Sequence, residues 1–166
     1  VNTLKIDTDS LIEKLSDIGV VAKNGNTENS LILEKGIDIR KSKEFSEGLF
    51  YAEDEASQTA ISVLAPKPDE RVLDICAAPG GKSFTMAGLM QNKGEIVSCD
   101  LYEHRVGLIL EGAKRLGIDI INAKVSDATV YNEKLGKFDV ILCDVPCSGL
   151  GVIRRKPDTK YKETED

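Results

Sequence analysis

The sequence predicts an α/β protein in which a small α/β unit precedes a doubly wound parallel sheet. From residue 71 onward, short apolar runs alternate with segments whose apolar residues recur at helical spacing. The chain has 166 residues, enough for one domain with a small appendage. Its composition, with 41% hydrophobic and 30% charged residues, is that of a folded globular domain.

Residues 1–46 are predicted to form the small unit. Short strands are expected at residues 1–6, 20–22, 31–33 and 37–39. A helix follows the first strand, capped by Thr8, Asp9 or Ser10 and ended by Gly19. One face of this helix is apolar and consists of Leu11, Ile12, Leu15 and Ile18.

Residues 47–70 are predicted to be a linker followed by a helix. Pro66 and Pro68 end that helix, because proline disfavours helical geometry in the residue before it. Its expected apolar face consists of Ala56, Ala60, Ile61 and Leu64. This segment is the expected boundary between the small unit and the main domain.

The main domain, residues 71–166, is predicted to alternate strands with helices. Strands are expected at residues 72–76, 95–100, 118–124 and 138–143, and helices at 82–90 and 102–116. Gly117 ends the second helix. Because short apolar strands separated by helices favour a parallel sheet, ligands are expected at the carboxyl ends of the strands.

A glycine-rich segment connects the first strand of this domain to its first helix. Residues 74–82 read D-I-C-A-A-P-G-G-K. The two glycines let the backbone approach a ligand closely, and the N–H groups at the helix start attract an anion. A tight turn without a ligand is the alternative, which the specificity of the motif disfavours.

Two acidic residues follow the next strands. Asp100 ends the second strand, where its carboxylate can accept hydrogen bonds from both hydroxyls of a ribose. Asp127 follows the third strand and is placed to accept from an adenine amino group. The alternatives are a helix cap for Asp100 and an ordinary loop residue for Asp127.

The fourth strand runs into residues 144–149, which read D-V-P-C-S-G. Here Asp144 and the thiol of Cys147 lie beside the expected ligand crevice, although a buried, inert cysteine is the alternative. The remaining cysteines, Cys76, Cys99 and Cys143, are expected to be inert. Because no C-x-x-C pair occurs, neither zinc nor any other metal is expected, and His104 is predicted to be a solvated helix residue.

Together, the segment at residues 74–82 and the sequence D-V-P-C-S-G-L-G-V-I-R-R-K-P-D resemble the Sun-type RNA (cytosine-5) methyltransferases, especially the bacterial enzymes of 16S ribosomal RNA. Further segments, V-N-T-L-K and G-L-F-Y-A-E-D-E-A-S, fit the family in order. The resemblance covers the chain from Val1 to its end. It implies a class I S-adenosylmethionine-dependent methyltransferase fold, Rossmann-like, with an RRM-like subdomain for RNA at residues 1–46.

The resemblance also implies S-adenosylmethionine as cofactor. The family's cofactor contacts fall on Cys76, Ala77, Ala78, Pro79, Gly80, Gly81, Lys82, Asp100, Asp127 and Asp144. In this family a thiolate adds to C6 of the cytosine, so that C5 attacks the methyl group. Cys147 corresponds to the cysteine that assists product release, whereas the attacking nucleophile belongs to a later T-C motif that this sequence lacks.

This sequence departs from the family pattern in further respects. It stops at Asp166 and lacks a long N-terminal domain, so we expect the middle portion of a longer enzyme, inactive by itself. Glu53 stands where relatives usually have glutamine. The sheet is expected to have the strand order 3-2-1-4, and self-association is expected through the exposed edge of the fourth strand.

The net charge and the apolar segments of the sequence indicate which partners and which compartment to expect. The net charge of −6 is not the footprint of a nucleic-acid binder, although Arg154, Arg155, Lys156, Lys160 and Lys162 form a basic cluster. No membrane span or signal peptide is evident, so a cytoplasmic protein with ribosomal RNA as partner is expected. A non-catalytic nucleoside- or RNA-binding module is the alternative, and a nicotinamide-dependent oxidoreductase is a third.

Overall fold

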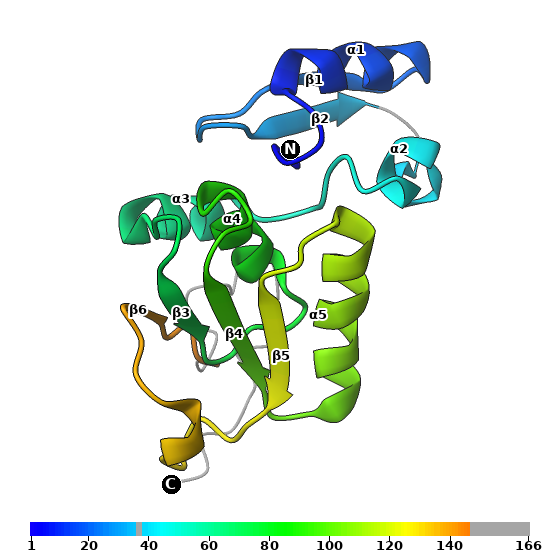
Figure 1. Cartoon of the computed structure of the whole chain (residues 1–166). Helices are drawn as coiled ribbons and strands as arrows, with labels where there is room; N and C mark the ends of the chain where they lie inside the picture. Colours follow the sequence, from blue (N-terminus) through cyan, green and yellow to red (C-terminus); the bar gives the residue numbers. More distant parts are fainter. Residues whose placement is uncertain (36–37, 147–166) are drawn as a thin grey trace, which may run out of the picture.

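A four-stranded parallel sheet forms the main unit of this computed structural model, which describes residues 1–35 and 38–146. Its strands are β3 (Arg71–Asp74), β4 (Glu95–Asp100), β5 (Ile121–Val125) and β6 (Val140–Leu142). They lie in the order β5-β4-β3-β6 (Figure 1). Counted along the chain within this unit, that is the predicted order 3-2-1-4.

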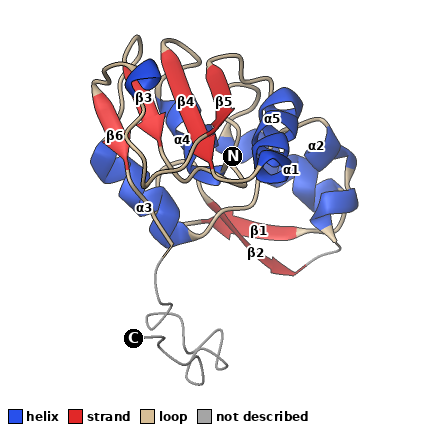
Figure 2. Cartoon of the chain, turned by 90° about the horizontal axis from the view of Figure 1, so that it is seen from below, coloured by secondary structure: helices blue, strands red, loops and turns tan. Residues whose placement is uncertain are grey.

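Three helices cover one face of this sheet (Figure 2). They are α3 (Glu55–Leu64), α4 (Gly81–Leu89) and α5 (Glu103–Leu116). Between them and the inward side chains of the strands lies the main core, which includes Ile61, Val72, Met86, Ile96 and Ile109. On the other face, Leu73, Val97 and Cys99 pack against residues from the short 3-10 helix η2 (Glu133–Leu135) and from the segment after it.

Several predicted boundaries shift for identifiable reasons. The strand expected from residue 118 begins at Ile121, because Ile118 still belongs to the end of α5. Its N–H donates to Ala113 O at 2.9 Å, and Gly117 adopts the left-handed conformation with φ at 73°. In β6, the middle residue Ile141 is 56% exposed, so within the described part of the chain this strand is not buried on both faces.

In the small unit, one of the helices packs on a two-stranded antiparallel sheet. The elements of this unit are α1 (Thr8–Asp17), β1 (Val21–Asn24), β2 (Leu31–Lys35), the 3-10 helix η1 (Ile39–Lys41) and α2 (Lys43–Ser46). Leu11, Leu15, Val20 and Phe50 form its core. The first two of these lie on the helix face expected from the sequence.

Three expectations for this unit were wrong. The first residues form a turn rather than a strand, since the N–H groups of Lys5 and Ile6 both donate to Asn2 O. The cap of α1 is Asp7, whose Oδ1 accepts from Ser10 N at 2.9 Å. Of the strand expected at residues 37–39, residue 37 lies outside the described residues, Asp38 is the cap of η1, and Ile39 is its first residue.

The linker helix α3 was placed correctly, but its buried face was not. Ile61 is fully buried and Leu64 is half-buried, whereas Ala56 and Ala60 are exposed. Ser57 and Gln58 are half-buried in their place. Gln58 accepts a hydrogen bond from Thr27 of the small unit at 2.7 Å, which accounts for a polar residue on the packed side of α3.

The small unit is held against the end of α5 by polar side chains. Asn2 Nδ2 donates to Gly48 O at 2.7 Å and to Leu116 O at 2.8 Å. Arg115 Nη1 donates to Phe45 O at 2.7 Å and to Phe50 O at 3.1 Å. These contacts satisfy carbonyl groups from both units.

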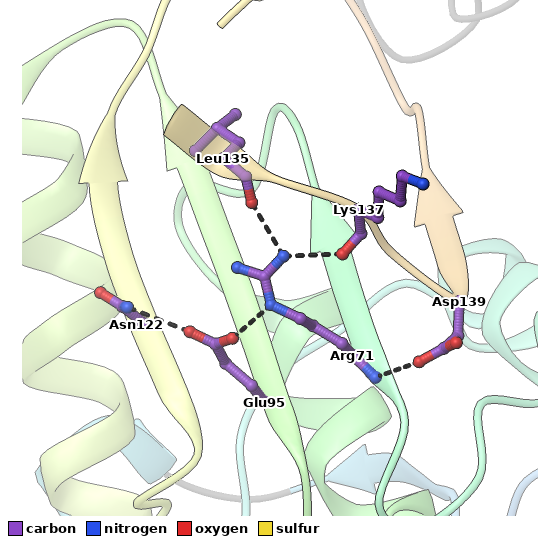
Figure 3. A network of polar contacts seen from close by, with 6 residues as sticks. All are labelled: Arg71, Glu95, Asn122, Leu135, Lys137 and Asp139. Carbon is purple, nitrogen blue, oxygen red and sulfur yellow. Dashed lines mark hydrogen bonds and ion pairs between the residues drawn. The ribbon is translucent and has the colours of Figure 1, made fainter. Parts of the chain in front are cut away.

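A polar network joins the amino ends of the main-sheet strands (Figure 3). Arg71 donates to Glu95 Oε2 at 2.6 Å and to the carbonyl groups of Leu135 and Lys137 at 2.8 and 2.7 Å. Its backbone N–H donates to Asp139 Oδ2 at 2.8 Å. Because this edge is occupied by structural contacts, the opposite edge is the one available for a ligand.

Candidate functional site

A cleft of about 410 Å³ opens at the carboxyl ends of β3 and β6. The loop that leads from β3 into α4 forms one wall, and the segment after β6 contributes another. Residues 52–54, which precede α3, also reach it. Of the residues expected to contact a cofactor, those that line this cleft are Cys76, Ala77, Ala78, Pro79, Gly81, Lys82 and Asp144.

Gly80 gives the loop after β3 its shape. Its φ is 110°, and a Cβ there would lie 2.4 Å from Phe84 Cζ, so both the backbone and the packing require glycine. The loop is tied to the neighbouring strand by Ala77 N, which donates to Cys99 O at 2.7 Å. Gly80 itself is buried beneath the cleft rather than lining it.

Helix α4 presents its positive end to the cleft. The first backbone N–H with an intrahelical partner is that of Phe84, which donates to Gly80 O at 2.9 Å, so the preceding N–H groups have no carbonyl one turn back. Lys82 adds a full charge beside them. Its Nζ lies 2.7 Å from Asp144 Oδ2, an ion pair that joins the α4 start to the segment after β6.

Asp100 lies directly behind the loop and is 3% exposed. Its Oδ2 accepts from Ala78 N at 3.3 Å, and its Oδ1 lies 3.2 Å from Arg105 Nη1. Arg105 also donates to Ala78 O at 3.0 Å. Oδ1 also accepts from Tyr102 N at 3.4 Å. The carboxylate therefore holds the loop in place, and Oδ2 keeps a second lone pair for a ligand hydroxyl.

Asp127 is exposed and lies in a turn after β5. Its Oδ1 accepts from Thr129 N at 2.9 Å and from Thr129 Oγ1 at 2.7 Å, and these hydrogen bonds lower the pKa of its carboxyl group. The preceding residue, Ser126, donates its N–H to Asp100 O at 3.0 Å. Asp127 thus lies at the same sheet edge as Asp100 but outside the cleft.

A buried polar cluster beneath the site was not anticipated from the sequence. Ser83 Oγ donates to Asp74 Oδ2 at 2.7 Å and lies 2.8 Å from Ser98 Oγ. Asp74 is 1% exposed, and burial raises the pKa of its carboxyl group to about 6. Within the described structure its Oδ1 has no hydrogen-bond partner. A strand-end aspartate followed by a helix with serine in its first turn was the available signal.

Glu53 is the second unanticipated feature of the cleft. It is half-buried, and burial raises the pKa of its carboxyl group. Its Oε2 accepts from Thr85 Oγ1 at 2.6 Å, and its Oε1 would lie 3.3 Å from a Cβ on Gly81. The sequence marked Glu53 only as a departure from the family's glutamine.

Three of the cysteines and the histidine lie within the described residues. Cys99 is buried, and burial raises the pKa of the thiols of both Cys99 and Cys76, which keeps them protonated. His104 is exposed on α5, as predicted, and stacks on Tyr102. Cys147 lies outside the described residues, as does the basic cluster that begins at Arg154.

Two further properties concern metals and membranes. Over residues 1–35 and 38–146, no three histidine, cysteine or acidic side chains gather in a way that would hold a metal ion. None of the helices in this part of the chain combines the length and the apolar character needed to cross a bilayer.

Comparison with known families gives a match over the whole of the main domain and the end of α3 before it. The sequence model of the 16S rRNA methyltransferase RsmB/F family matches residues 61–166. Over 169 aligned residues the chain is 46% identical to a probable ribosomal RNA small subunit methyltransferase B of Bacillus subtilis. It is 34% identical over 161 residues to a 25S rRNA (cytosine-C(5))-methyltransferase of Arabidopsis thaliana.

The chain corresponds to only part of these relatives. The alignment covers 100% of this chain but 38% of the Bacillus protein, and 95% of this chain but 28% of the Arabidopsis protein. Among solved structures, a methyltransferase homologue from Pyrococcus horikoshii superposes with a TM-score of 0.84 at 35% identity. That superposition covers 97% of this chain and 54% of the other.

Proposed function

The chain belongs to the 16S rRNA methyltransferase RsmB/F family, and we propose that it is the cofactor-binding portion of an RNA (cytosine-5) methyltransferase. One observation carries the proposal. The start of α4, Lys82 and Asp100 converge at the carboxyl edge of a parallel sheet, where a charged nucleoside derivative would bind.

The residues of this edge fit S-adenosylmethionine, the cofactor that the family uses. The unpaired N–H groups of α4 and the Lys82 ammonium suit the carboxylate of its amino-acid end. Asp100 supplies acceptors for ribose hydroxyls, and Asp127 follows the neighbouring strand as a candidate acceptor for the adenine amino group. When bound, this cofactor supplies an electrophilic methyl group.

The protein's own chemistry in this proposal concerns the cytosine ring. C5 of cytosine is a weak nucleophile, and addition of a cysteine thiolate to C6 turns the ring into an enamine that is a strong one. After C5 has gained the methyl group, it loses its proton, and the thiolate is expelled to restore the ring. Cys147 is proposed to assist that release, and the attacking thiolate is proposed to come from a T-C motif outside this sequence.

The proposed substrate is a cytosine in 16S ribosomal RNA, taken out of its stack to reach the site. Support comes from the matched family and from the Bacillus relative, which is described as acting on the RNA of the small ribosomal subunit. The proposed compartment is the cytoplasm, where ribosomal RNA is found in bacteria. The small unit is proposed to be the RNA-binding, RRM-like part.

Self-association through β6 is a separate proposal. Among the described strands, β6 pairs with β3 alone, and its Ile141 is 56% exposed. A strand edge with an apolar residue offers a template for a second strand. Size-exclusion chromatography should show dimers that an Ile141→Lys variant abolishes, and a monomeric wild-type protein would contradict the proposal.

The experiment for the main proposal uses the intact gene product, 16S ribosomal RNA and S-adenosylmethionine with a labelled methyl group. We expect label in RNA, recovered as 5-methylcytosine after hydrolysis. A Cys147→Ala variant should accumulate a covalent protein–RNA complex that survives a denaturing gel. Methylation at another atom would refute the cytosine-5 reaction, and RNA binding without any transfer would favour a non-catalytic module.

A further inference from the structure

Glu53 lies in the cleft, and its environment is that of a hydrogen-bond acceptor for a ligand. It comes from the segment that joins the small unit to α3, whereas the rest of the proposed cofactor site comes from the strand ends and α4. Two carboxylates of the cleft differ in their partners. Asp144 is paired with Lys82 at 2.7 Å, while Glu53 has only a hydroxyl partner among the described residues.

That hydroxyl partner sets the orientation of Glu53. Thr85 Oγ1 lies 2.6 Å from Glu53 Oε2 and 2.8 Å from the hydroxyl oxygen of Tyr51. Thr85 has a single proton, with acceptors at Glu53 Oε2 and, farther away at 3.2 Å, at Gly81 O. The shorter distance favours donation to Glu53, and Tyr51 is then the donor to Thr85. The hydrogen bonds therefore run from Tyr51 to Thr85 and from Thr85 to Glu53, and the carboxylate of Glu53 is the final acceptor.

The second oxygen of this carboxylate is left without a donor. Glu53 Oε1 is buried and makes no hydrogen bond to any described residue. Gly81 gives it room against the start of α4, since a Cβ at that position would lie 3.3 Å from Oε1 and 3.6 Å from Cδ. An unpaired carboxylate oxygen in a buried position is costly, and a donor from a ligand would relieve that cost.

The charges around Glu53 indicate which donor fits. Lys82, on the adjacent α4, is a cation whose field acts on Glu53, and together they present a positive and a negative group to one cleft. An α-amino acid carries the opposite arrangement, with its ammonium and carboxylate on the same carbon. A ligand whose carboxylate meets Lys82 and the α4 start thus brings its ammonium toward Glu53.

We propose that the Glu53 carboxylate binds the α-ammonium group at the amino-acid end of S-adenosylmethionine. This inference rests on the proposed function, in which S-adenosylmethionine is the cofactor. Glu53 is then a binding residue contributed by the linker between the two units. It discriminates zwitterionic ligands from those that have a carboxylate alone. The two other described carboxylates with an unpaired buried oxygen, Glu44 and Asp74, do not line the cleft, so they are not in position for this role.

The test combines a protein variant with a ligand variant. Calorimetry measures the binding of S-adenosylhomocysteine and of its analogue without the α-amino group to wild type, Glu53→Gln and Glu55→Gln. Glu55 is an exposed neighbour outside the cleft and serves as a matched control. We expect Glu53→Gln to weaken S-adenosylhomocysteine about tenfold, as for the loss of a charged hydrogen bond, and to leave the analogue unchanged.

Each other outcome overturns the inference. Equal weakening of both ligands would mean that Glu53 only shapes the cleft, and equal or tighter binding of S-adenosylhomocysteine would mean that Glu53 does not meet the ammonium. Failure of wild type to bind either ligand would overturn the proposed function itself. If Glu53→Gln does not fold, Thr85→Val replaces it, and the same selective loss is expected because Glu53 loses its orienting donor.

Discussion

Asp100 connects the loop geometry to the proposed ribose contact. It is almost fully buried, and it accepts from Ala78 N, Tyr102 N and Arg105 while Oδ2 retains a lone pair for a ligand. We expect Asp100→Ala to weaken binding of S-adenosylhomocysteine by roughly ten- to a hundredfold, since a charged hydrogen-bond acceptor is lost. Calorimetry against Asp119→Ala, an exposed aspartate remote from the cleft, provides the control. Equal affinities for the two variants would exclude Asp100 from the site.

Asp74 should make the stability of the fold depend on pH. Its folded pKa, about 6, lies above its ordinary value of 3.8, so the ionised carboxylate destabilises the folded state above pH 6. Lowering the pH from 6 toward 3.8 removes that penalty progressively. Relative to Asp74→Asn, wild type should gain about 1 kcal/mol between pH 7.5 and pH 5. Urea unfolding at both pH values measures this, and parallel behaviour of the two proteins would contradict it.

Some residues in and beneath the cleft could be predicted from the sequence, and others could not. Cys76 and Lys82 were assigned to a ligand site from the motif they belong to, and the structure places both in the cleft. Asp74 and Glu53 gain their significance from burial and from partners distant in the chain, such as Ser98 and Thr85. Spacing along the sequence carries no signal for such contacts.

At the scale of elements, replacing two glycines by alanine should change the stability of the protein in opposite directions. Gly80 precedes α4, and Gly107 lies within α5. Gly80→Ala forces a Cβ to 2.4 Å from Phe84 at a φ of 110°, so we expect lower stability and loss of cofactor binding. Gly107→Ala, inside α5 with nothing within 4 Å of the new Cβ, should stabilise the protein by about 0.5–1 kcal/mol. Thermal unfolding compares them, and similar midpoints would show that the loop tolerates a side chain.

Element prediction succeeded where periodicity and end signals agreed. The strand at Glu95–Asp100 was predicted with its observed bounds, and α5 ends where Gly117 was expected to end it. The opening residues were mistaken for a strand because the apolar residues Val1, Leu4 and Ile6 give no sign of the hydrogen bonds to Asn2 O that fold this segment into a turn. There, the side chain of Asn2 binds the end of α5, a partner more than a hundred residues away.

Across the whole molecule, Arg115 joins the two units. Besides donating to Phe45 O and Phe50 O, its guanidinium lies 3.8 Å from the centre of the Phe45 ring. Arg115→Met should destabilise the small unit by about 2 kcal/mol, with faster amide exchange in β1 and β2 than in β3 and β4. Lys114→Met, an exposed neighbour, is the control. Uniform acceleration in both sheets would mean that the units unfold together.

For the molecule as a whole, the proposed function means that the cleft between β3 and β6 accepts an adenosyl amino acid rather than a dinucleotide. The direct measurement is a calorimetric titration of the protein with S-adenosylhomocysteine and, separately, with NADH. We predict saturable one-to-one binding of S-adenosylhomocysteine and no binding of NADH. Binding of NADH without S-adenosylhomocysteine would contradict the account, because the start of α4, Lys82 and Asp100 would then serve a different cofactor.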